Sequence, residues 1–263
     1  MPHPPAGSLR DTSDLARRYS ETSHWQRQRG RLLIDLAQPR AGERVLDLGC
    51  GTGELSCELA RRVGPSGRVV AIDPAAARLE RARATRPAGL DQLVFEQAAA
   101  ADLARFENRS FDLVYSNYAV HWVLDQPAML GEIRRVLRAG GRFASEFLSE
   151  PIPLFVDLIE LMPNGDDIAG ENRFLGEAPW REMIAARRLE TERFERPEIP
   201  LRYADLPGLF DWLEATSHGA FEAARIAPAA RRDLESRFPG EIVCLCKAFR
   251  MILRHAPETA PEP

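Results

Sequence analysis

Lysine is almost absent from this chain of 263 residues: Lys247 is the only one, so arginine carries nearly all of the positive charge. Mechanisms that need a lysine in a loop are therefore excluded, among them the phosphate-binding lysine of a P-loop and a lysine Schiff base. The net charge of -4 gives no general attraction toward nucleic acid, and we expect no nucleic-acid partner.

Cysteines and long apolar runs are also few. The four cysteines give no disulfide framework, and Cys244 and Cys246 are too close together for the usual zinc spacing, so we expect no metal site. No apolar run is long enough to span a bilayer, and the first residues have no apolar stretch of signal-peptide type. The composition predicts a cytoplasmic globular protein without a membrane partner, and it leaves the oligomeric state open.

The first half of the chain alternates short apolar strands with helices. Strands joined by helical crossovers of this length indicate a parallel sheet with right-handed connections. The expected strands are 44–48, 68–72, 93–95, 111–115 and 142–147, and the expected helices are 54–63, 75–83 and 125–137.

This alternation ends after Glu150. Residues 151–180 are rich in Pro, Gly and Asp, with one apolar helix near 154–161, and predict an insertion beside the sheet. Segments 189–194 and 242–253 are expected to be the last two strands, which close the sheet antiparallel at one edge. The fold class is therefore α/β, with a Rossmann-like, seven-stranded, mostly parallel sheet flanked by helices.

The most informative segment is Asp47-Leu48-Gly49-Cys50-Gly51-Thr52-Gly53, directly after the first strand. Glycines at alternate positions let the backbone turn tightly and approach a ligand where a Cβ atom would collide. The helix that starts at Glu54 directs its free N–H groups at the same place. A dinucleotide fingerprint would have its third glycine where Glu54 stands. Because a carboxylate is a poor neighbour for a pyrophosphate, the loop favours a ligand without phosphates.

Asp73 ends the second strand, where a carboxylate can accept hydrogen bonds from both hydroxyls of a ribose. Enzymes that bind NAD place an acidic residue at the same point, so Asp73 alone does not separate the two ligand classes. The alternative is a helix N-cap before Pro74, which is compatible with ligand binding.

In order and spacing, the glycine loop, Asp73, Phe111-Asp112-Leu113-Val114 and Leu137-x-x-Gly140-Gly141 resemble the class I S-adenosylmethionine-dependent methyltransferases over residues 26–147. The resemblance implies S-adenosyl-L-methionine as the cofactor. It implies that the loop holds the methionine part, that Asp73 binds the ribose and that the chain after the fourth strand lines the methyl-transfer mouth. The implied cofactor-binding residues are Asp47, Gly49, Cys50, Gly51, Gly53, Asp73, Pro74, Ala99, Ala100, Ser116 and Asn117.

One position departs from the family pattern. The family often has an aspartate after the third strand that faces the adenine amino group, whereas this chain has Ala98-Ala99-Ala100 there. Ala99 occupies the acidic position, which leaves backbone groups near Ala100 to contact the adenine.

The segment after the fourth strand indicates which class of molecule accepts the methyl group. It reads Ser116-Asn117-Tyr118-Ala119 and lacks the Asn/Asp-Pro-Pro-Tyr of enzymes that methylate adenine or amide nitrogens. Together with His121-Trp122, with Trp25-Gln26 and with the stretch 212–219, it resembles the trans-aconitate and juvenile hormone acid methyltransferases, which esterify small carboxylic acids.

Chemistry gives a second reason to consider a carboxylate. An acid with a pKa of ~4.3 is already ionised at neutral pH and needs no general base, so the enzyme's task is alignment. Gln26 and Trp122 would position such an acceptor. A hydroxyl, amine or carbon would need a base, for which His121 is the best-placed candidate. The alternatives are a structural or pocket-lining His121 and a Trp122 that fills the core.

We therefore expect a methyltransferase that acts on a small molecule, preferably a carboxylate. A C-, N- or hydroxyl-directed methyltransferase of secondary metabolism stays open, and so does a non-catalytic cofactor-binding scaffold. Tyr19 and Trp25 would cover the cofactor as a lid. The single domain would comprise an N-terminal arm and lid (1–30), a cofactor-binding core (31–147), an inserted cap (151–187), C-terminal strands and helices (188–253) and a flexible tail (257–263).

Overall fold

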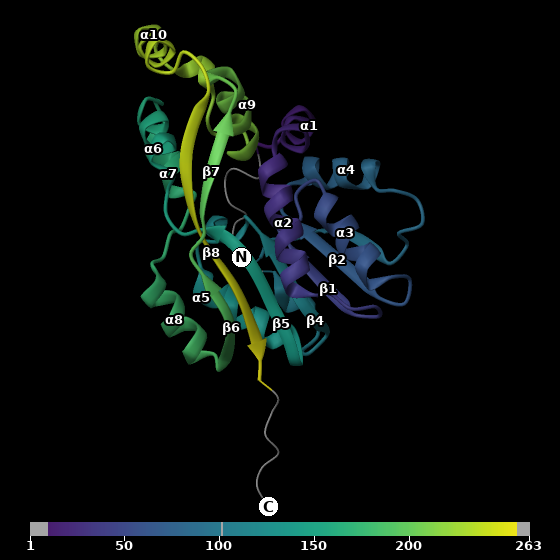
Figure 1. Cartoon of the computed structure of the whole chain (residues 1–263). Helices are drawn as coiled ribbons and strands as arrows, with labels where there is room; N and C mark the ends of the chain where they lie inside the picture. Colours follow the sequence, from purple (N-terminus) through teal and green to yellow (C-terminus); the bar gives the residue numbers. More distant parts are fainter. Residues whose placement is uncertain (1–9, 101, 257–263) are drawn as a thin grey trace, which may run out of the picture.

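The computed structural model describes residues 10–100 and 102–256, so the first nine residues of the predicted arm and lid (1–30) and the whole predicted tail (257–263) lie outside the described residues. The strands are β1 (Arg44–Leu48), β2 (Arg68–Asp73), β3 (Leu93–Gln97), β4 (Phe111–Asn117), β5 (Leu137–Leu148), β6 (Leu189–Glu195), β7 (Glu198–Tyr203) and β8 (Ile242–His255). In the described part they form an eight-stranded sheet in the order β3-β2-β1-β4-β5-β8-β6, and β7 pairs with β8 (Figure 1).

The α-helices alternate with the strands in the first half, and those of the second half, apart from α8, gather at one end (Figure 1). They are α1 (Ser13–Thr22), α2 (His24–Ala37), α3 (Glu54–Val63), α4 (Ala76–Thr85), α5 (Gln126–Val136), α6 (Pro153–Glu160), α7 (Gly165–Gly170), α8 (Glu177–Ala186), α9 (Leu206–Thr216) and α10 (Pro228–Arg237). Short 3-10 turns lie at Leu103–Arg105, Val120–Trp122 and Ala223–Arg225.

The predicted alternation is confirmed. All five strands and three helices expected in the first half are present, and β1 and α3 have the predicted bounds. The strands from β3 to β5 are parallel, and β8 runs antiparallel between β5 and β6, as predicted. The expected count of seven strands misses β7. This strand contains Pro200 and pairs only with the first half of β8, so its sequence has a weak strand pattern.

Two apolar cores cover the two faces of the sheet. Helices α2 and α3 pack on one face, through residues such as Leu33, Ile34 and Leu59. Helices α5 and α8 pack on the other face, where Leu130 and Trp180 are fully buried. The strands from β1 to β5 are therefore apolar on both sides, as expected for a parallel sheet covered by helices.

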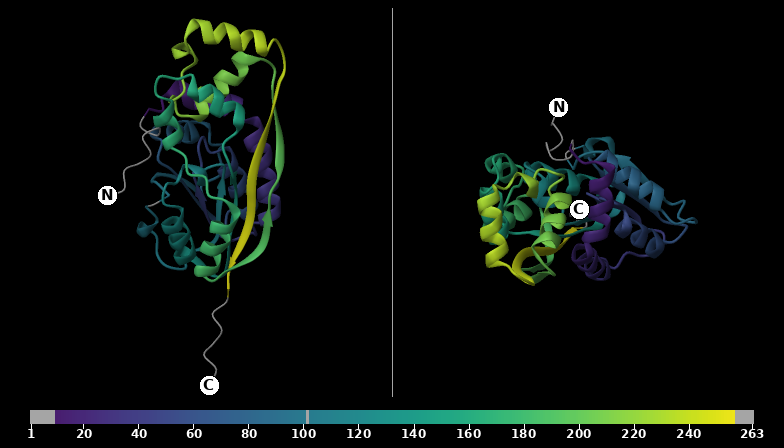
Figure 2. Two further views of the ribbon diagram at one scale, coloured as in Figure 1. Left: turned by 90° about the vertical axis from the view of Figure 1, so that its left-hand side faces the viewer. Right: turned by 90° about the horizontal axis from the view of Figure 1, so that it is seen from above.

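A second cluster of helices stands beyond the carboxyl ends of the parallel strands (Figure 2). It contains α6, α7, α9 and α10, packed around their own apolar core, and the ribbon of β7 and the first half of β8 rises into it. The predicted cap at 151–187 is divided by this arrangement: α6 and α7 belong to the second cluster, whereas α8 lies on the sheet because Trp180 packs against Phe147 of β5.

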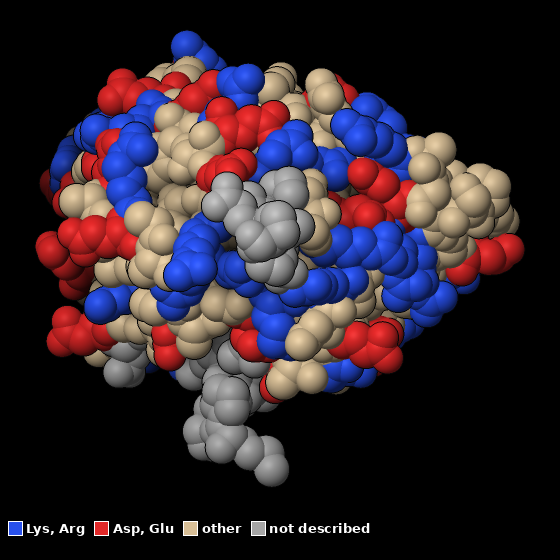
Figure 3. All heavy atoms as spheres, turned by 90° about the horizontal axis from the view of Figure 1, so that it is seen from below, with Lys and Arg blue, Asp and Glu red and all other residues tan. Residues whose placement is uncertain are grey.

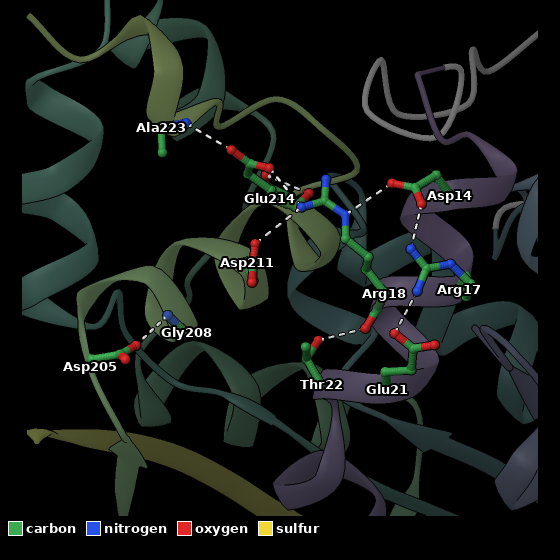
Figure 4. Close-up of polar contacts among 11 residues, drawn as sticks. Asp14, Arg17, Arg18, Glu21, Thr22, Asp205, Gly208, Asp211, Glu214 and Ala223 are labelled. Atoms are coloured by element: carbon green, nitrogen blue, oxygen red, sulfur yellow. Dashed lines mark hydrogen bonds and ion pairs between the residues drawn. The ribbon is translucent and has the colours of Figure 1, made fainter.

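Helix α1 joins the sheet to this second cluster. The Arg18 guanidinium pairs with Glu214 of α9 at 2.9 Å and with Asp211 at 3.4 Å, while its Nε lies 3.2 Å from Asp14 (Figure 4). Glu214 also accepts a hydrogen bond from the backbone N–H of Ala223. The N-terminal helix is therefore fixed to α9, at the end of the sheet where the parallel strands terminate.

A buried carboxylate ties several elements together at the same end. Glu146 of β5 is fully buried and accepts hydrogen bonds from Arg29 of α2 at 2.7 and 3.1 Å, from Arg250 of β8 and from the Tyr118 hydroxyl at 2.9 Å. Arg250 also donates to Glu195 of β6 at 2.8 Å. The Arg29 side chain therefore points from α2 toward the sheet.

Replacing this carboxylate should destabilise the fold. We expect Glu146→Gln to lower the free energy of unfolding by about 3–5 kcal/mol, because it leaves partly buried guanidinium groups without their charged acceptor. Urea denaturation of the purified variant measures this loss. The matched control is Glu150→Gln, whose exposed carboxylate pairs with Lys247 at 2.9 Å and should change stability by under ~1 kcal/mol. Equal small losses in both variants would contradict the role assigned to Glu146.

Candidate functional site

A cavity of about 820 Å³ opens at the carboxyl ends of β1, β2 and β4. Its walls come from the loops that follow these strands, from α1 and α2, and from the end of α9. The second helical cluster closes it from above, because Trp212, Thr216 and His218 contribute to the lining. The site therefore lies where open parallel sheets commonly bind ligands, outside the carboxyl ends of the strands.

The glycine loop has the conformation that its sequence requires. Gly49, Gly51 and Gly53 have φ angles of 78°, 55° and 84°, in the left-handed region that favours glycine. A Cβ atom on Gly49 would lie 2.3 Å from the Cβ of Ala119, and one on Gly53 would lie 2.8 Å from the Cβ of Ala82. Gly49 and Gly51 line the cavity, whereas Gly53 serves the packing of the loop against α4 and β3.

Asp73 lies at the floor of the cavity with 6% of its surface exposed. Its carboxylate accepts hydrogen bonds from the backbone N–H groups of Gly51 at 2.8 Å and of Ala75 at 2.9 Å, one on each oxygen. Each oxygen keeps a further lone pair that can accept from a ligand hydroxyl. Pro74 lines the cavity beside it.

Four predicted cofactor residues do not line this cavity: Gly53, which packs against α4 and β3, and Asp47, Cys50 and Ser116. Asp47 and Cys50 face a narrow recess of about 30 Å³ that shares Tyr19, Gln26, Gly49 and Asn117 with the cavity. Burial raises the pKa of Asp47 to about 7, against the effect of the hydrogen bond from Ser56. Ser116 is fully buried and donates its hydroxyl hydrogen to the Leu48 carbonyl at 2.9 Å, so its observed role is to join β4 to β1.

Asn117 is the polar residue at the mouth. Its amide nitrogen donates to the Gln26 carbonyl at 3.0 Å, while its side-chain oxygen is buried without a partner in the described part of the chain. A buried polar atom without a partner is costly, so this oxygen fits a ligand that donates a hydrogen bond.

The alanine run lies at the far wall. Ala98, Ala99 and Ala100 line the cavity, and the nearby Asp102 is exposed and does not belong to the lining. The position that the family often fills with an acid therefore presents a methyl group here.

His121 is buried at the junction of the cavity with the second helical cluster. Its ring stacks on Phe174 at 6.1 Å and lies 5.6 Å from Trp122, and its Nδ1 has no partner among the described residues. Burial lowers the pKa of His121 to about 3. A ring with so little affinity for a proton is a weak general base.

Trp122 and Gln26 both reach the cavity wall. Trp122 is half-buried, with its ring edge-on to His218 at 5.4 Å. The Gln26 side chain is buried, and its carbonyl oxygen accepts from the indole N–H of Trp212 at 3.4 Å.

The two predicted lid residues also line the cavity. The Tyr19 ring lies over the glycine loop, where a Cβ on Gly51 would be 3.4 Å from it, and the Arg78 guanidinium stacks on the ring at 4.2 Å. Trp25 packs edge-on against Tyr118 at 4.6 Å.

Sequence reasoning missed a charged cluster at the cavity wall. Arg78 of α4 and the His218 ring share the carboxylate of Asp11, with His218 Nδ1 at 2.9 Å, and Arg78 also donates to the Ala215 carbonyl at 2.8 Å. The partners of Asp11 are 67 and 207 residues away in sequence, so no local pattern could have revealed this cluster.

Neither a metal-binding cluster nor a membrane-spanning helix is found among the described residues. Within residues 10–100 and 102–256, no group of three or more His, Cys, Asp or Glu side chains could hold a metal ion. In the same part of the chain, no helix has both the length and the apolar character needed to cross a membrane.

Comparison with known proteins identifies the family. A family model described as a methyltransferase domain matches residues 39–171. Trans-aconitate 2-methyltransferase of Deinococcus radiodurans is 31% identical over 246 residues, which are 86% of this chain and 90% of that protein. Aklanonic acid methyltransferase of Streptomyces sp. strain C5 is 37% identical over 115 residues, 44% of this chain and 52% of that protein.

Among solved structures, the YcgJ protein of Bacillus subtilis superimposes with a TM-score of 0.64 at 21% identity, covering 88% of this chain and 98% of that one. This likeness concerns the fold. With the family model and the relative that spans most of the sequence, the chain belongs to the S-adenosylmethionine-dependent methyltransferases, and S-adenosyl-L-methionine is its cofactor.

Proposed function

We propose that this enzyme methylates a carboxylate oxygen of a small organic acid and so forms a methyl ester. The observation that carries the proposal is the chemistry of the cavity mouth. The glycine loop and Asp73 suit the cofactor. His121 and Tyr118 line the cavity next to them, and neither side chain is suited to remove a proton from an acceptor. Burial lowers the pKa of His121 to about 3 and raises that of Tyr118 well above its usual range.

The residues around the glycine loop fit the cofactor. Asp73 would accept from the two ribose hydroxyls, and the unpartnered side-chain oxygen of Asn117 would accept from the amino group of the methionine part. Ala99 and Ala100 would lie against the adenine, with backbone groups supplying the polar contacts. Asp47 and Cys50 would contribute from the narrow recess, while Ser116 and Gly53 would hold the loop in place.

When bound, the cofactor supplies a methyl group on a positively charged sulfur, which leaves as a neutral thioether. The acceptor's carboxylate oxygen forms the new bond to carbon with its own electron pair, so no proton has to move. The chain's contribution is to align the two reactants and to exclude water. Gln26 and Trp122 would position the acceptor, and α1 with the start of α2 would cover the cofactor through Tyr19 and Trp25.

The second histidine of the cavity wall is His218. Burial lowers the pKa of His218, against the effect of its hydrogen bond to Asp11. A hydroxyl, amine or carbon acceptor would therefore lack an effective base among the described histidines of the wall. The two named relatives support a carboxylate acceptor, because trans-aconitate and aklanonic acid are both acids.

The acceptor is proposed to be a small molecule in a cytoplasmic setting. The net charge of the chain is -4, and a negative net charge does not favour nucleic acid as the acceptor. On the lower face of the protein, at the opposite end of the sheet from the cavity, acidic side chains lie among the arginines (Figure 3).

Removing the Asp73 carboxylate should weaken cofactor binding. We expect Asp73→Ala to reduce the affinity for S-adenosylhomocysteine by ~1.5–3 kcal/mol, because two ribose hydroxyls lose a charged acceptor. Isothermal calorimetry measures this affinity. The matched control is Asp112→Ala. Asp112 lies near the amino end of β4, away from the cavity, and its carboxylate accepts a hydrogen bond from the Arg44 backbone N–H at 2.8 Å. Equal losses in both variants would indicate a general effect on the fold, and tight NAD binding would overturn the cofactor assignment.

The product of the reaction should be an ester. With methyl-labelled cofactor and a panel of organic acids, each paired with the corresponding alcohol and amine, we expect label to enter only the acids. Mild alkali should release it as methanol, because esters hydrolyse under conditions that leave ethers and methylamines intact. Label that survives alkali would place the methyl group on oxygen of an alcohol, on nitrogen or on carbon. No transfer to any acceptor would favour a non-catalytic scaffold.

The mechanism should not depend on a histidine base. We expect His121→Ala to lower kcat by less than roughly tenfold, under ~1.4 kcal/mol of barrier. The pH–rate profile should have no ascending limb from the titration of His121 between pH 5 and 8, because a group with a pKa of about 3 stays unprotonated throughout this range. Removal of a true general base costs roughly 10²–10⁴-fold. Loss of turnover on that scale, with cofactor binding intact, would exclude a carboxylate acceptor.

A further inference from the structure

A second cavity of about 660 Å³ adjoins the first. It lies between α6, α7 and the end of α9, and both cavities are lined by His121, Trp122, Leu148, Trp212 and Thr216. Its volume is in the range of small-molecule sites, ~300–1,000 Å³. Because the two cavities share a wall at the methyl-transfer mouth, a molecule in the second cavity can present one end to the first.

Most of the residues that line the second cavity are apolar. The side chains that α6, α7 and the segments next to them direct into it include Phe155, Val156, Ile159, Met162, Ile168 and Phe174. Val156 keeps 37% of its surface exposed. An apolar ligand would cover these side chains and release the water that contacts them.

The charges around both cavities disfavour an acceptor with several carboxylates. Among the described residues that line the second cavity, the charged side chains are Glu160 and Asp166, both acidic. Among those that line the first cavity, Arg78 is the one arginine, and it is engaged by Asp11, by the Ala215 carbonyl and by the Tyr19 ring. Each additional carboxylate would therefore be buried without a cation, which is costly.

Polar atoms occur where the two cavities meet. The Thr216 hydroxyl and the His121 Nδ1 are buried without partners among the described residues, and both side chains belong to the shared wall. One polar group of a ligand can be satisfied there, while most of the remainder meets apolar surface. The uncharged polar side chains Asn164, Asn172 and Ser217 of the second cavity do not belong to the shared wall.

We propose, on the basis of the function proposed above, that the acceptor is a monocarboxylic acid with a hydrophobic chain or ring. Its apolar body occupies the cavity between α6, α7 and α9, and its carboxylate lies at the wall formed by Thr216 and His121. This substrate class differs from trans-aconitate, the polycarboxylate named for the relative from Deinococcus radiodurans.

Chain length tests the proposal. With labelled cofactor and the full-length enzyme, KM should fall about three- to fourfold for each methylene from hexanoate to decanoate, because each one enters apolar surroundings. Trans-aconitate should be a poor substrate at every concentration. A KM that is independent of chain length, or better turnover of trans-aconitate than of decanoate, would overturn the proposal.

A pair of variants tests the location. Val156 and Leu161 belong to the same segment and have exposed fractions of 37% and 38%, but only Val156 lines the cavity. Val156→Asn should weaken decanoate binding by about fivefold or more, whereas Leu161→Asn should leave it unchanged. Affinity for S-adenosylhomocysteine should be the same in both variants. Equal effects of the two substitutions would contradict the assigned cavity.

Binding of decanol separates this inference from the proposed reaction. Calorimetry with S-adenosylhomocysteine present should detect both decanol and decanoate, and Val156→Asn should weaken both. If both bind in this way and no ester forms, the apolar cavity stands and the carboxylate reaction fails. If esters form on short acids while neither ten-carbon ligand binds, the reaction stands and the apolar cavity fails.

Discussion

The buried carboxylate of Glu146 is the interaction on which the arrangement of this molecule depends. It lies in β5 next to Asn117 of β4, at the level where the sheet gives way to the second helical cluster. Its carboxylate accepts hydrogen bonds from Arg29 of α2, from Arg250 of β8 and from the hydroxyl of Tyr118, which follows β4. A buried charge is tolerated only when it is paired and hydrogen-bonded. The four elements must therefore meet in this geometry for the carboxylate to be satisfied.

The same interaction shapes the cavity wall. Tyr118 has a φ of 54°, a left-handed conformation that costs a residue other than glycine about 1–3 kcal/mol. Two contacts to Glu146 hold it there: the Tyr118 backbone N–H donates to the Glu146 carbonyl at 2.7 Å, and its hydroxyl donates to the carboxylate. After this sharp turn the chain crosses the strand ends. Ala119 therefore packs against Gly49, and His121 and Trp122 lie in the cavity wall.

Gly49, Gly51 and Asp73, which line the cavity, were predictable from sequence because their determinants are local. They lie at the ends of strands or directly after them, and a strand with its turn carries a recognisable pattern over a few residues. The charged contacts of the cavity wall and of α2 are not local. Arg78, Asp11 and His218 meet from three distant segments, and the paired state of Arg29 depends on a carboxylate 117 residues away. Helical spacing could show that Arg29 lies on one side of α2 but not what it faces.

The weak basicity of His121 and the apolar second cavity have the same physical cause. Phe174 and Trp122 surround the histidine ring, and the side chains of α6 and α7 continue this surface away from the strand ends. Such surroundings oppose isolated charge, which disfavours a protonated histidine and any mechanism that creates one. They favour a reaction in which a carboxylate and a positively charged donor become two neutral products, because charge disappears as the bond forms. An environment that suppresses general-base catalysis thus remains suited to esterification of a hydrophobic acid.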